Sequence, residues 1–163
     1  AQLLEHMTHL LALREREPAP MAVIALRIDG LAAVVTSLGT ESANVLRRKV
    51  AVRLRASLRA SDVVASIGND SFLVLLAWID AATDGERVAA KLVQSLRQPF
   101  NVAGNDVAIG ASAGLALYPE HGKTADALLR RSVGQAASLA TMGREGFANR
   151  VERGPSTAAN DGA

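Results

Sequence analysis

The feature that most constrains the fold is a series of short apolar runs, each closed by turn-forming residues. The clearest run covers residues 21–28, eight residues with the single charge of Arg27. A nearly continuous apolar run of this length is typical of a strand that is covered on both faces. The other expected strands cover residues 63–67, 72–79, 100–102, 107–118 and 147–151.

The intervals between these runs carry apolar residues at helical spacing. In residues 41–60, for example, Leu46, Val50 and Leu54 recur every four positions along one helix face. The expected helices cover residues 2–17, 31–38, 41–60, 84–96 and 125–142. Turn residues at 68–71, and Gly104 with Asn105, are expected to close two β-hairpins. Together the pattern predicts an α/β fold, a mixed β-sheet sandwiched by helices.

Composition excludes several classes of function. The chain has no cysteine, which excludes disulfides and thiolate metal sites, and only 3% aromatic residues, which argues against stacking single-stranded nucleic acid. A net charge of +2 predicts no general attraction to polyanions. The cations of residues 41–60 are therefore interpreted as a solvated face and not as a nucleic-acid surface. They are Arg47, Arg48, Lys49, Arg53, Arg55 and Arg59.

The chain is expected to hold one domain over residues 1–151, with residues 1–17 as its N-terminal helix. Residues 152–163 have the composition of a flexible tail or an interdomain linker. The sequence begins with Ala1 and not with methionine, so we expect a piece of a longer protein. No targeting signal or apolar stretch of membrane-spanning length is visible, and we expect a cytoplasmic location without membrane contact.

Four pieces of sequence, in this order, resemble the GGDEF domains of the diguanylate cyclase family. Residues 7–10 (MTHL) resemble the LTGL motif, residues 26–29 (LRID) the strand that ends in DxD, and residues 111–122 the SxGxAxYPxxG strand and turn. Residues 61–76 resemble the signature hairpin. Its tip is formed by Gly68, Asn69, Asp70, Ser71 and Phe72. The resemblance covers nearly everything except the tail and implies the nucleotide cyclase-like GGDEF fold.

The chemistry that this resemblance implies needs a divalent metal. Family members condense two GTP molecules into cyclic di-GMP, with carboxylates at the first position of DxD and the fourth position of the signature as metal ligands. Here these positions hold Arg27 and Ser71. A guanidinium repels a metal ion, and the remaining Asp29 and Asp70 do not recreate the ligand set. We therefore expect no metal, no cofactor and no catalytic residue.

Other family roles fall on residues that lack the necessary chemistry. The guanine-reading positions fall at Val35 and near Asn44, and the phosphate-binding lysine of the last long helix falls at Ala140. The aspartate and tyrosine of that helix fall at Val133 and Ala137. Outside the family pattern, Glu5, His6 and His9 share helical spacing, but no further metal ligand is identifiable beside them. The chain is thus expected not to be an enzyme.

One binding motif of the family is retained. Residues 59–62 (RASD) match the RxxD product site that ends five residues before the signature. Arg59 offers a bidentate donor, Asp62 an acceptor for guanine, and Arg87 and Lys91 are available from the following helix. The alternative interpretation is that Asp62 caps the entry to the following strand and that Arg59 is one more cation on a solvated helix face.

These observations predict a catalytically inactive GGDEF domain that acts as a regulatory or interaction module in bacterial cyclic di-GMP signalling. Its candidate ligand is cyclic di-GMP at Arg59, Asp62, Arg87 and Lys91, and its candidate partner is an adjacent EAL-like domain or another protein. One alternative is an interaction or homodimerisation scaffold without nucleotide. A second is an enzyme remnant that binds GTP weakly.

Overall fold

The computed structural model describes residues 2–16, 19–141 and 146–147 of the chain. Its helices are α1 (Gln2–Arg16), α2 (Leu31–Leu38), α3 (Thr40–Ala56), α4 (Ala82–Leu96) and α5 (Ala125–Thr141). Its strands are β1 (Met21–Asp29), β2 (Val63–Ser66), β3 (Ser71–Leu76), β4 (Phe100–Val102), β5 (Asn105–Val107), β6 (Gly110–Tyr118) and β7 (Gly146–Phe147).

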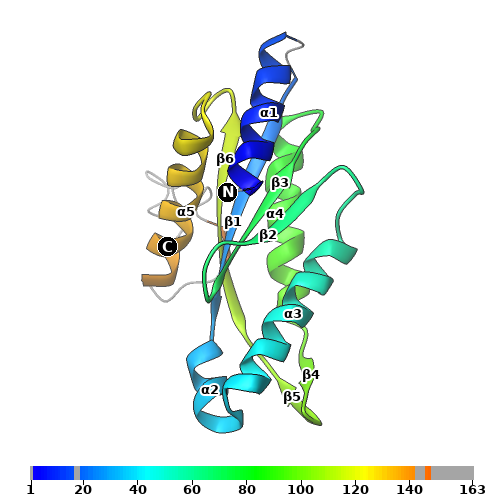
Figure 1. Cartoon of the computed structure of the whole chain (residues 1–163), viewed down its shortest axis with the longest axis vertical. Helices are drawn as coiled ribbons and strands as arrows, with labels where there is room; N and C mark the ends of the chain where they lie inside the picture. Colours follow the sequence, from blue (N-terminus) through cyan, green and yellow to red (C-terminus); the bar gives the residue numbers. More distant parts are fainter. Residues whose placement is uncertain (1, 17–18, 142–145, 148–163) are drawn as a thin grey trace.

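A five-stranded sheet with the order β2-β3-β1-β6-β7 forms the centre of the molecule (Figure 1). β1 pairs antiparallel with both β3 and β6, and β7 pairs parallel with β6. Helices cover both faces of this sheet, so the predicted mixed sheet sandwiched by helices is confirmed. β4 and β5 form a separate two-stranded ribbon.

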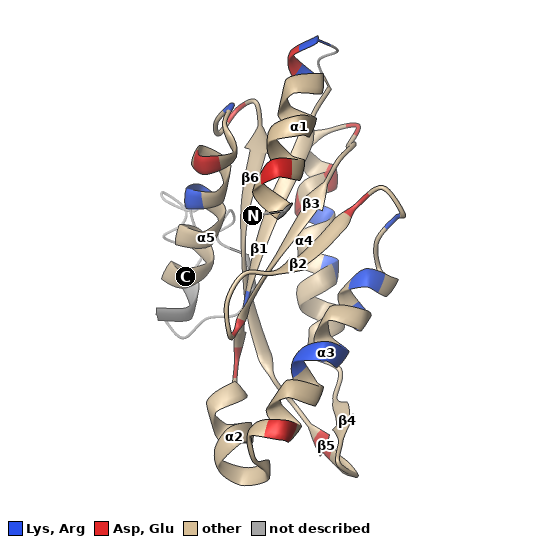
Figure 2. Cartoon of the chain, viewed as in Figure 1, with Lys and Arg blue, Asp and Glu red and all other residues tan. Residues whose placement is uncertain are grey.

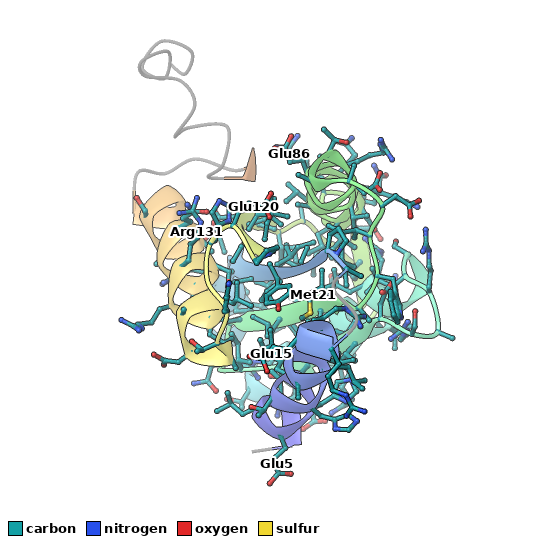
Figure 3. The ribbon with its side chains drawn as sticks, turned by 90° about the horizontal axis from the view of Figure 1, so that it is seen from above. Glu5, Glu15, Met21, Glu86, Glu120 and Arg131 are labelled. Carbon is teal, nitrogen blue, oxygen red and sulfur yellow. The ribbon has the colours of Figure 1, made fainter. Side chains whose placement is uncertain are left out.

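Strand β1 divides its side chains between two hydrophobic clusters. Ile24 and Leu26 belong to the cluster that packs against α2, α3 and α4, whereas Met21 and Val23 belong to the cluster with α1 and α5. Figure 3 shows Met21 inside the molecule, between α1 and the sheet. Because successive strand residues face opposite sides, the odd-numbered position of Arg27 places it on the α5 side.

Helix α5 lies unusually close to β6. A Cβ atom on Gly114 of β6 would overlap the carbonyl oxygen of Ser132 and the backbone nitrogen of Ala136. Only glycine leaves the space for this approach of helix and strand. The packing fixes α5 over the end of β1, where the candidate site lies.

Helix α1 is held to the sheet by a buried arginine. Arg14 is 1% exposed, and its guanidinium donates a hydrogen bond to the carbonyl oxygen of Ala77 and lies 3.6 Å from the centre of the Trp78 ring. The Trp78 ring remains half-exposed on its other side. A buried charge that is hydrogen-bonded and stacked in this way joins the N-terminal helix to the end of β3.

The second predicted hairpin is partly wrong. The run expected as one strand over residues 107–118 forms two strands, since β5 pairs with β4 and β6 crosses into the central sheet. The turn consists of Ala103 and Gly104, with φ angles of 54° and 79°, one residue earlier than predicted. Two consecutive residues with positive φ are what a tight hairpin turn requires.

Several boundaries also differ from the prediction. Helix α3 ends at Ala56, because residues 57–62 form the turn that leads into β2. Helix α4 begins at Ala82, two residues early, since the carboxylate of Asp84 accepts hydrogen bonds from the N–H groups of Asp80 and Ala81 at 3.0 Å each. Residues 148–151 of the predicted last strand lie outside the described residues. In the described part of the chain, no helix has the length and apolar character to cross a membrane.

Candidate functional site

The end of β1 and the β2–β3 hairpin bring together the two positions that the family resemblance assigns to metal ligands. Arg27 of β1 lies in register with Ser71 of β3 on one side and with Ser112 of β6 on the other. Residues in register on neighbouring strands point to the same face of a sheet. Arg27, Ser71 and Ser112 therefore form one row on the face that α5 covers.

The hairpin tip is bound to β1 through Asp70. One guanidinium nitrogen of Arg27 lies 3.8 Å from a carboxylate oxygen of Asp70, and both side chains are two-fifths exposed or slightly more. The hydroxyl of Ser71 donates to the other carboxylate oxygen of Asp70 at 3.2 Å. The N–H of Ile28 donates to the backbone oxygen of Asp70 at 2.7 Å. Charge and backbone contacts thus hold this loop against the end of β1.

Helix α5 presents an apolar wall to this row. A hollow of about 30 Å³ is lined by Arg27, by Ile67 and Ser71 of the β2–β3 hairpin, and by Val133 and Ala137 of α5. A space of this size holds about one water molecule. Val133 and Ala137 are the positions where the family resemblance expected an aspartate and a tyrosine, so the structure brings these substituted positions to the same place as Arg27.

The side chains at the end of β1 do not fit a divalent cation. Such a cation takes oxygen ligands, preferably carboxylates, and a guanidinium at the first DxD position adds positive charge where the cation would bind. Within residues 2–16, 19–141 and 146–147, no three His, Asp or Glu side chains are grouped closely enough to hold a metal ion.

The residues at the expected guanine-reading positions differ in their surroundings. Val35 on α2 is 39% exposed and offers no hydrogen bond. The side-chain oxygen of Asn44 accepts a hydrogen bond from Arg47, and the Nε of Arg47 donates to the backbone oxygen of Asn69 at the hairpin tip. Arg47 is a residue of the site that the sequence analysis missed. The available signal was its spacing of three from Asn44, which places both side chains on one helix face.

The RxxD motif forms a closed turn. A carboxylate oxygen of Asp62 accepts from the N–H of Arg59 at 2.9 Å, and the N–H of Asp62 donates to the carbonyl oxygen of Arg59 at 3.0 Å. Arg55 donates to the carbonyl oxygens of both residues. Asp62 is 7% exposed, whereas the side chain of Arg59 is exposed. Asp62 therefore has the capping role that one of the two interpretations of the motif expected.

The two helical cations predicted beside this motif lie on α4. Arg87 and Lys91 are both exposed and stand four residues apart, which places them on one face of the helix. Arg87 donates to a carboxylate oxygen of Asp84 at 2.9 Å. Arg59 thus contacts Asp62 through its backbone N–H, and the side chain of Arg87 forms an ion pair with Asp84.

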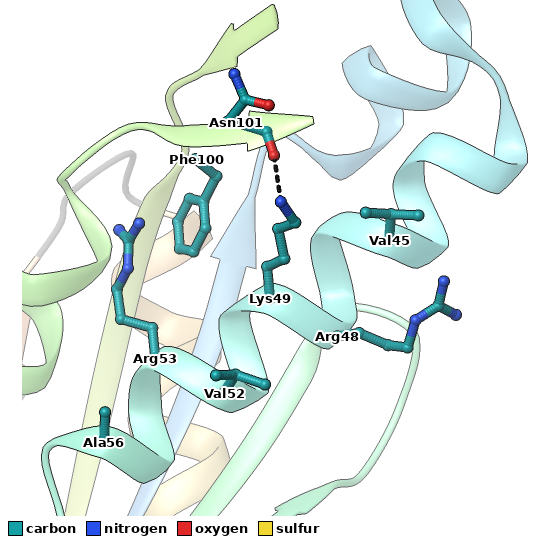
Figure 4. A pocket seen from close by; sticks show the side chains of 8 residues that line it. All are labelled: Val45, Arg48, Lys49, Val52, Arg53, Ala56, Phe100 and Asn101. Carbon is teal, nitrogen blue, oxygen red and sulfur yellow. Dashed lines mark hydrogen bonds between the residues drawn. The ribbon is translucent and has the colours of Figure 1, made fainter. Parts of the chain in front are cut away.

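Figure 2 shows Lys and Arg residues along α3. Of the six cations interpreted as a solvated face, Arg48, Lys49 and Arg59 are exposed and Arg47, Arg53 and Arg55 are partly buried, and several of them donate hydrogen bonds to backbone carbonyl groups. Lys49 donates to the carbonyl oxygen of Asn101 at 2.7 Å (Figure 4). Arg53 lies 3.5 Å from the ring centre of Phe100. It also donates to three carbonyl oxygens just after or within the last turn of α4, those of Ser95 at 3.1 Å, Gln98 at 2.6 Å and Pro99 at 2.9 Å.

The physical reason lies at the end of α4. The last carbonyl groups of a helix have no partner within the helix and carry partial negative charge. Among the acceptors of Arg53 and Lys49, only Ser95 belongs to α4, and its carbonyl oxygen also accepts from the N–H of Gln98 at 3.3 Å. The carbonyl groups of Gln98, Pro99 and Asn101 follow the helix, in the connection and in β4. Arg53 and Lys49 therefore stabilise the connection from α4 to the β4–β5 ribbon, while Arg48 remains exposed with a distant ion pair to Glu41 at 3.8 Å.

Comparison with known proteins agrees with this architecture. The chain is 34% identical over 132 residues to the bifunctional diguanylate cyclase/cyclic di-GMP phosphodiesterase MucR of Pseudomonas aeruginosa, a match that covers 81% of this chain and 19% of MucR. It is 36% identical over 110 residues to the diguanylate cyclase TpbB of the same organism, covering 67% of this chain and 25% of TpbB. The chain thus spans a quarter or less of these relatives.

Solved structures give the same result. The crystal structure of the GGDEF domain of TpbB superposes with a TM-score of 0.84 at 28% identity, covering 89% of this chain and 91% of that one. An EAL/GGDEF domain protein from M. capsulatus matches with a TM-score of 0.75 at 32% identity, covering 85% and 90%. The family described as diguanylate cyclase, GGDEF domain, matches residues 1–145. The chain belongs to the GGDEF domain family.

Proposed function

We propose that this chain is a catalytically inactive GGDEF domain that acts as a regulatory or interaction module in cyclic di-GMP signalling. The observation that carries the proposal is the ion pair between Arg27 and Asp70, with Ser71 in register beside it. Arg27 and Ser71 occupy the two positions where the family resemblance requires metal-binding carboxylates, and Asp70 is the retained carboxylate beside them. The guanidinium of Arg27 partly neutralises the carboxylate of Asp70, which weakens the attraction of that carboxylate for a metal ion.

The apolar surroundings support the same proposal. Val35, Val133 and Ala137 stand where the family resemblance expects polar contacts, and hydrocarbon side chains supply no hydrogen bond to a guanine base or to a triphosphate. A site that leaves the polar groups of a ligand without partners binds it weakly. Weak GTP binding by an enzyme remnant is the alternative that this argument disfavours.

A titration of the full chain with GTP and Mg²⁺ directly tests whether the chain binds GTP. We expect no saturable binding by calorimetry at millimolar nucleotide. Saturable GTP binding that requires Mg²⁺ and is lost in Asp70→Asn would favour the alternative of an enzyme remnant that binds GTP weakly. The same titration with Mg²⁺ alone separates metal binding from nucleotide binding.

For the ligand, we propose cyclic di-GMP at the turn formed by Arg59 and Asp62, with Arg87 and Lys91 as additional cations. The exposed guanidinium of Arg59 supports this, because a planar fork of donors suits a phosphate or a guanine edge. The carboxylate of Asp62 is already engaged with the N–H of Arg59, but a carboxylate has further acceptor sites.

Calorimetry with cyclic di-GMP distinguishes a ligand-binding module from a scaffold. We expect micromolar binding that Arg59→Ala abolishes, whereas Arg48→Ala, a change of an exposed arginine on α3, the helix before that turn, leaves it unchanged. No heat at high protein concentration would support the second candidate, an interaction or homodimerisation scaffold without nucleotide. The observation that favours this second candidate is the burial of Asp62 in its own turn.

The partner we propose is an adjacent EAL-like phosphodiesterase domain or another protein of the same pathway, in the cytoplasm. The relatives MucR and NbdA of Pseudomonas aeruginosa are named as cyclic di-GMP phosphodiesterases, MucR also as a cyclase. Each is several times longer than the matched region. Residues 152–163 would form the linker between domain 1–151 and that neighbour. Phosphodiesterase activity of the longer protein with and without Arg59→Ala tests this control.

A further inference from the structure

A second surface, away from the end of β1, has the character of a docking groove. It lies between α3 and β4 and encloses about 530 Å³ (Figure 4). Its apolar side chains on α3 are Val45, Val52 and Ala56. Val52 is 69% exposed, the most exposed large apolar side chain in the described part of the chain.

The apolar residues of the groove form a stripe along α3. Val45, Val52 and Ala56 follow one another at intervals of seven and four residues, the spacing of one helix face. The distance from the first to the last is about 16 Å, eleven residues at 1.5 Å each. A stripe of this kind and length matches the contact face of a second helix of about three turns.

Cations flank this stripe on both sides. Arg48, Lys49 and Arg53 line the groove, and the residues that line it include no carboxylate. Arg48 is 67% exposed, and its only ion pair in the described residues is the exposed one with Glu41 at 3.8 Å. Lys49 and Arg53 donate to backbone carbonyls, which fixes their positions but leaves their positive charge in place.

We propose that this groove binds an acidic amphipathic helix of a partner protein. The apolar stripe would receive the apolar face of that helix, and the flanking cations would pair with its glutamates or aspartates. A nucleic acid fits less well, because the only aromatic residue in the groove, Phe100, is 2% exposed beneath Arg53 and offers no ring for base stacking.

The probe is a synthetic peptide of about two heptads, long enough to cover the stripe, with leucine at a and d and glutamate at e and g. Its binding to the full chain is measured by fluorescence anisotropy at low and high salt. We expect saturable binding that weakens with salt and weakens at least about tenfold in Val52→Glu, since a buried valine contributes about that factor. Arg48→Glu should weaken it as well.

Two matched variants serve as controls, Leu13→Glu on α1 and Arg130→Glu on α5, which change an apolar and a basic residue that lie partly exposed away from the groove. Neither should alter binding. The proposal is overturned if the peptide does not bind, if all four variants weaken it equally, or if a peptide with lysine in place of glutamate binds as well. It is also overturned if single-stranded oligonucleotide binds with equal affinity and the same dependence on Val52. Circular dichroism shows that each variant is folded.

Discussion

The guanidinium of Arg27 lies 3.8 Å from the carboxylate of Asp70 at the point where β1 meets the β2–β3 hairpin. The ion pair links Asp70, at the tip of the hairpin, to β1, the central strand of the sheet. A positive charge is therefore part of the polypeptide at a place where the family resemblance expects a metal ion.

Replacing both substituted positions with carboxylates should restore a metal site. In Arg27→Asp/Ser71→Glu, the new side chains would join Asp29 and Asp70 at the end of β1, and four oxygen donors attract a divalent cation. We expect Mn²⁺ binding at least tenfold tighter than in the unmodified chain, measured by calorimetry. Since Val35 and Val133 are unchanged in this variant, synthesis of cyclic di-GMP should remain absent. A double variant that binds Mn²⁺ no better than the original would contradict this account of the site.

The close approach of α5 to β6 should make Gly114 intolerant of any side chain. The added methyl group of Gly114→Ala would overlap the backbone of Ser132 and Ala136, which are held within α5. We expect a loss of about 3 kcal/mol in the free energy of unfolding, or failure to fold. The matched control is Gly134→Ala, where nothing lies within 4 Å of the new Cβ atom. This variant should gain up to about 1 kcal/mol, because alanine favours the helix.

The contacts of Arg53 should be structural. Arg53→Met keeps most of the aliphatic stem but removes the donors to the carbonyl groups of Ser95, Gln98 and Pro99. We expect a loss of about 2 kcal/mol in urea unfolding, since hydrogen bonds from a charged group contribute this much when their acceptors lose a partner. Arg48→Met, on the exposed side of the same helix, should change stability by less than about 0.5 kcal/mol. Equal effects of the two substitutions would show that Arg53 is solvated.

The start of α4 should make stability depend on pH. The N–H group of Ala81, then that of Asp80, and also Arg87 hold the pKa of Asp84 below its ordinary value. A carboxylate whose pKa is lower in the folded state stabilises the fold at pH values above about 4. This contribution is lost as the pH falls through the lowered pKa. Asp84→Asn should therefore destabilise the chain at pH 6 more than at pH 3, and an equal effect at both values would refute the capping role.

The strand over residues 21–28 followed from the sequence, because a nearly continuous apolar run of this length is typical of a strand covered on both faces. The run 21–28 is apolar on both faces, and its odd and even positions fill two separate clusters. The same alternation places Arg27 beside Ser71 once the hairpin is paired. Local pattern was sufficient for the strand itself, whereas the order β2-β3-β1-β6-β7 depends on pairing between distant segments and was not predicted.

The roles of the cations on α3 did not follow from the sequence. A polar residue on an amphipathic helix is normally exposed, and nothing local to Lys49 or Arg53 indicates that the end of α4 lies beside them. Their acceptors are 42 to 52 residues away in the sequence. Similarly, the division between β5 and β6 depends on which sheet each strand joins. The roles of Lys49 and Arg53 and the division between β5 and β6 depend on contacts between distant segments, and these contacts cannot be read from the pattern of a single sequence.

The most direct test of the central proposal is the synthesis of cyclic di-GMP by the purified chain. GTP and Mg²⁺ are incubated with the protein at high concentration, an active diguanylate cyclase serves as the positive control, and the product is quantified by liquid chromatography and mass spectrometry. The account predicts no product above the level of the protein-free reaction. Product that accumulates with protein concentration and disappears in Asp70→Asn would contradict it.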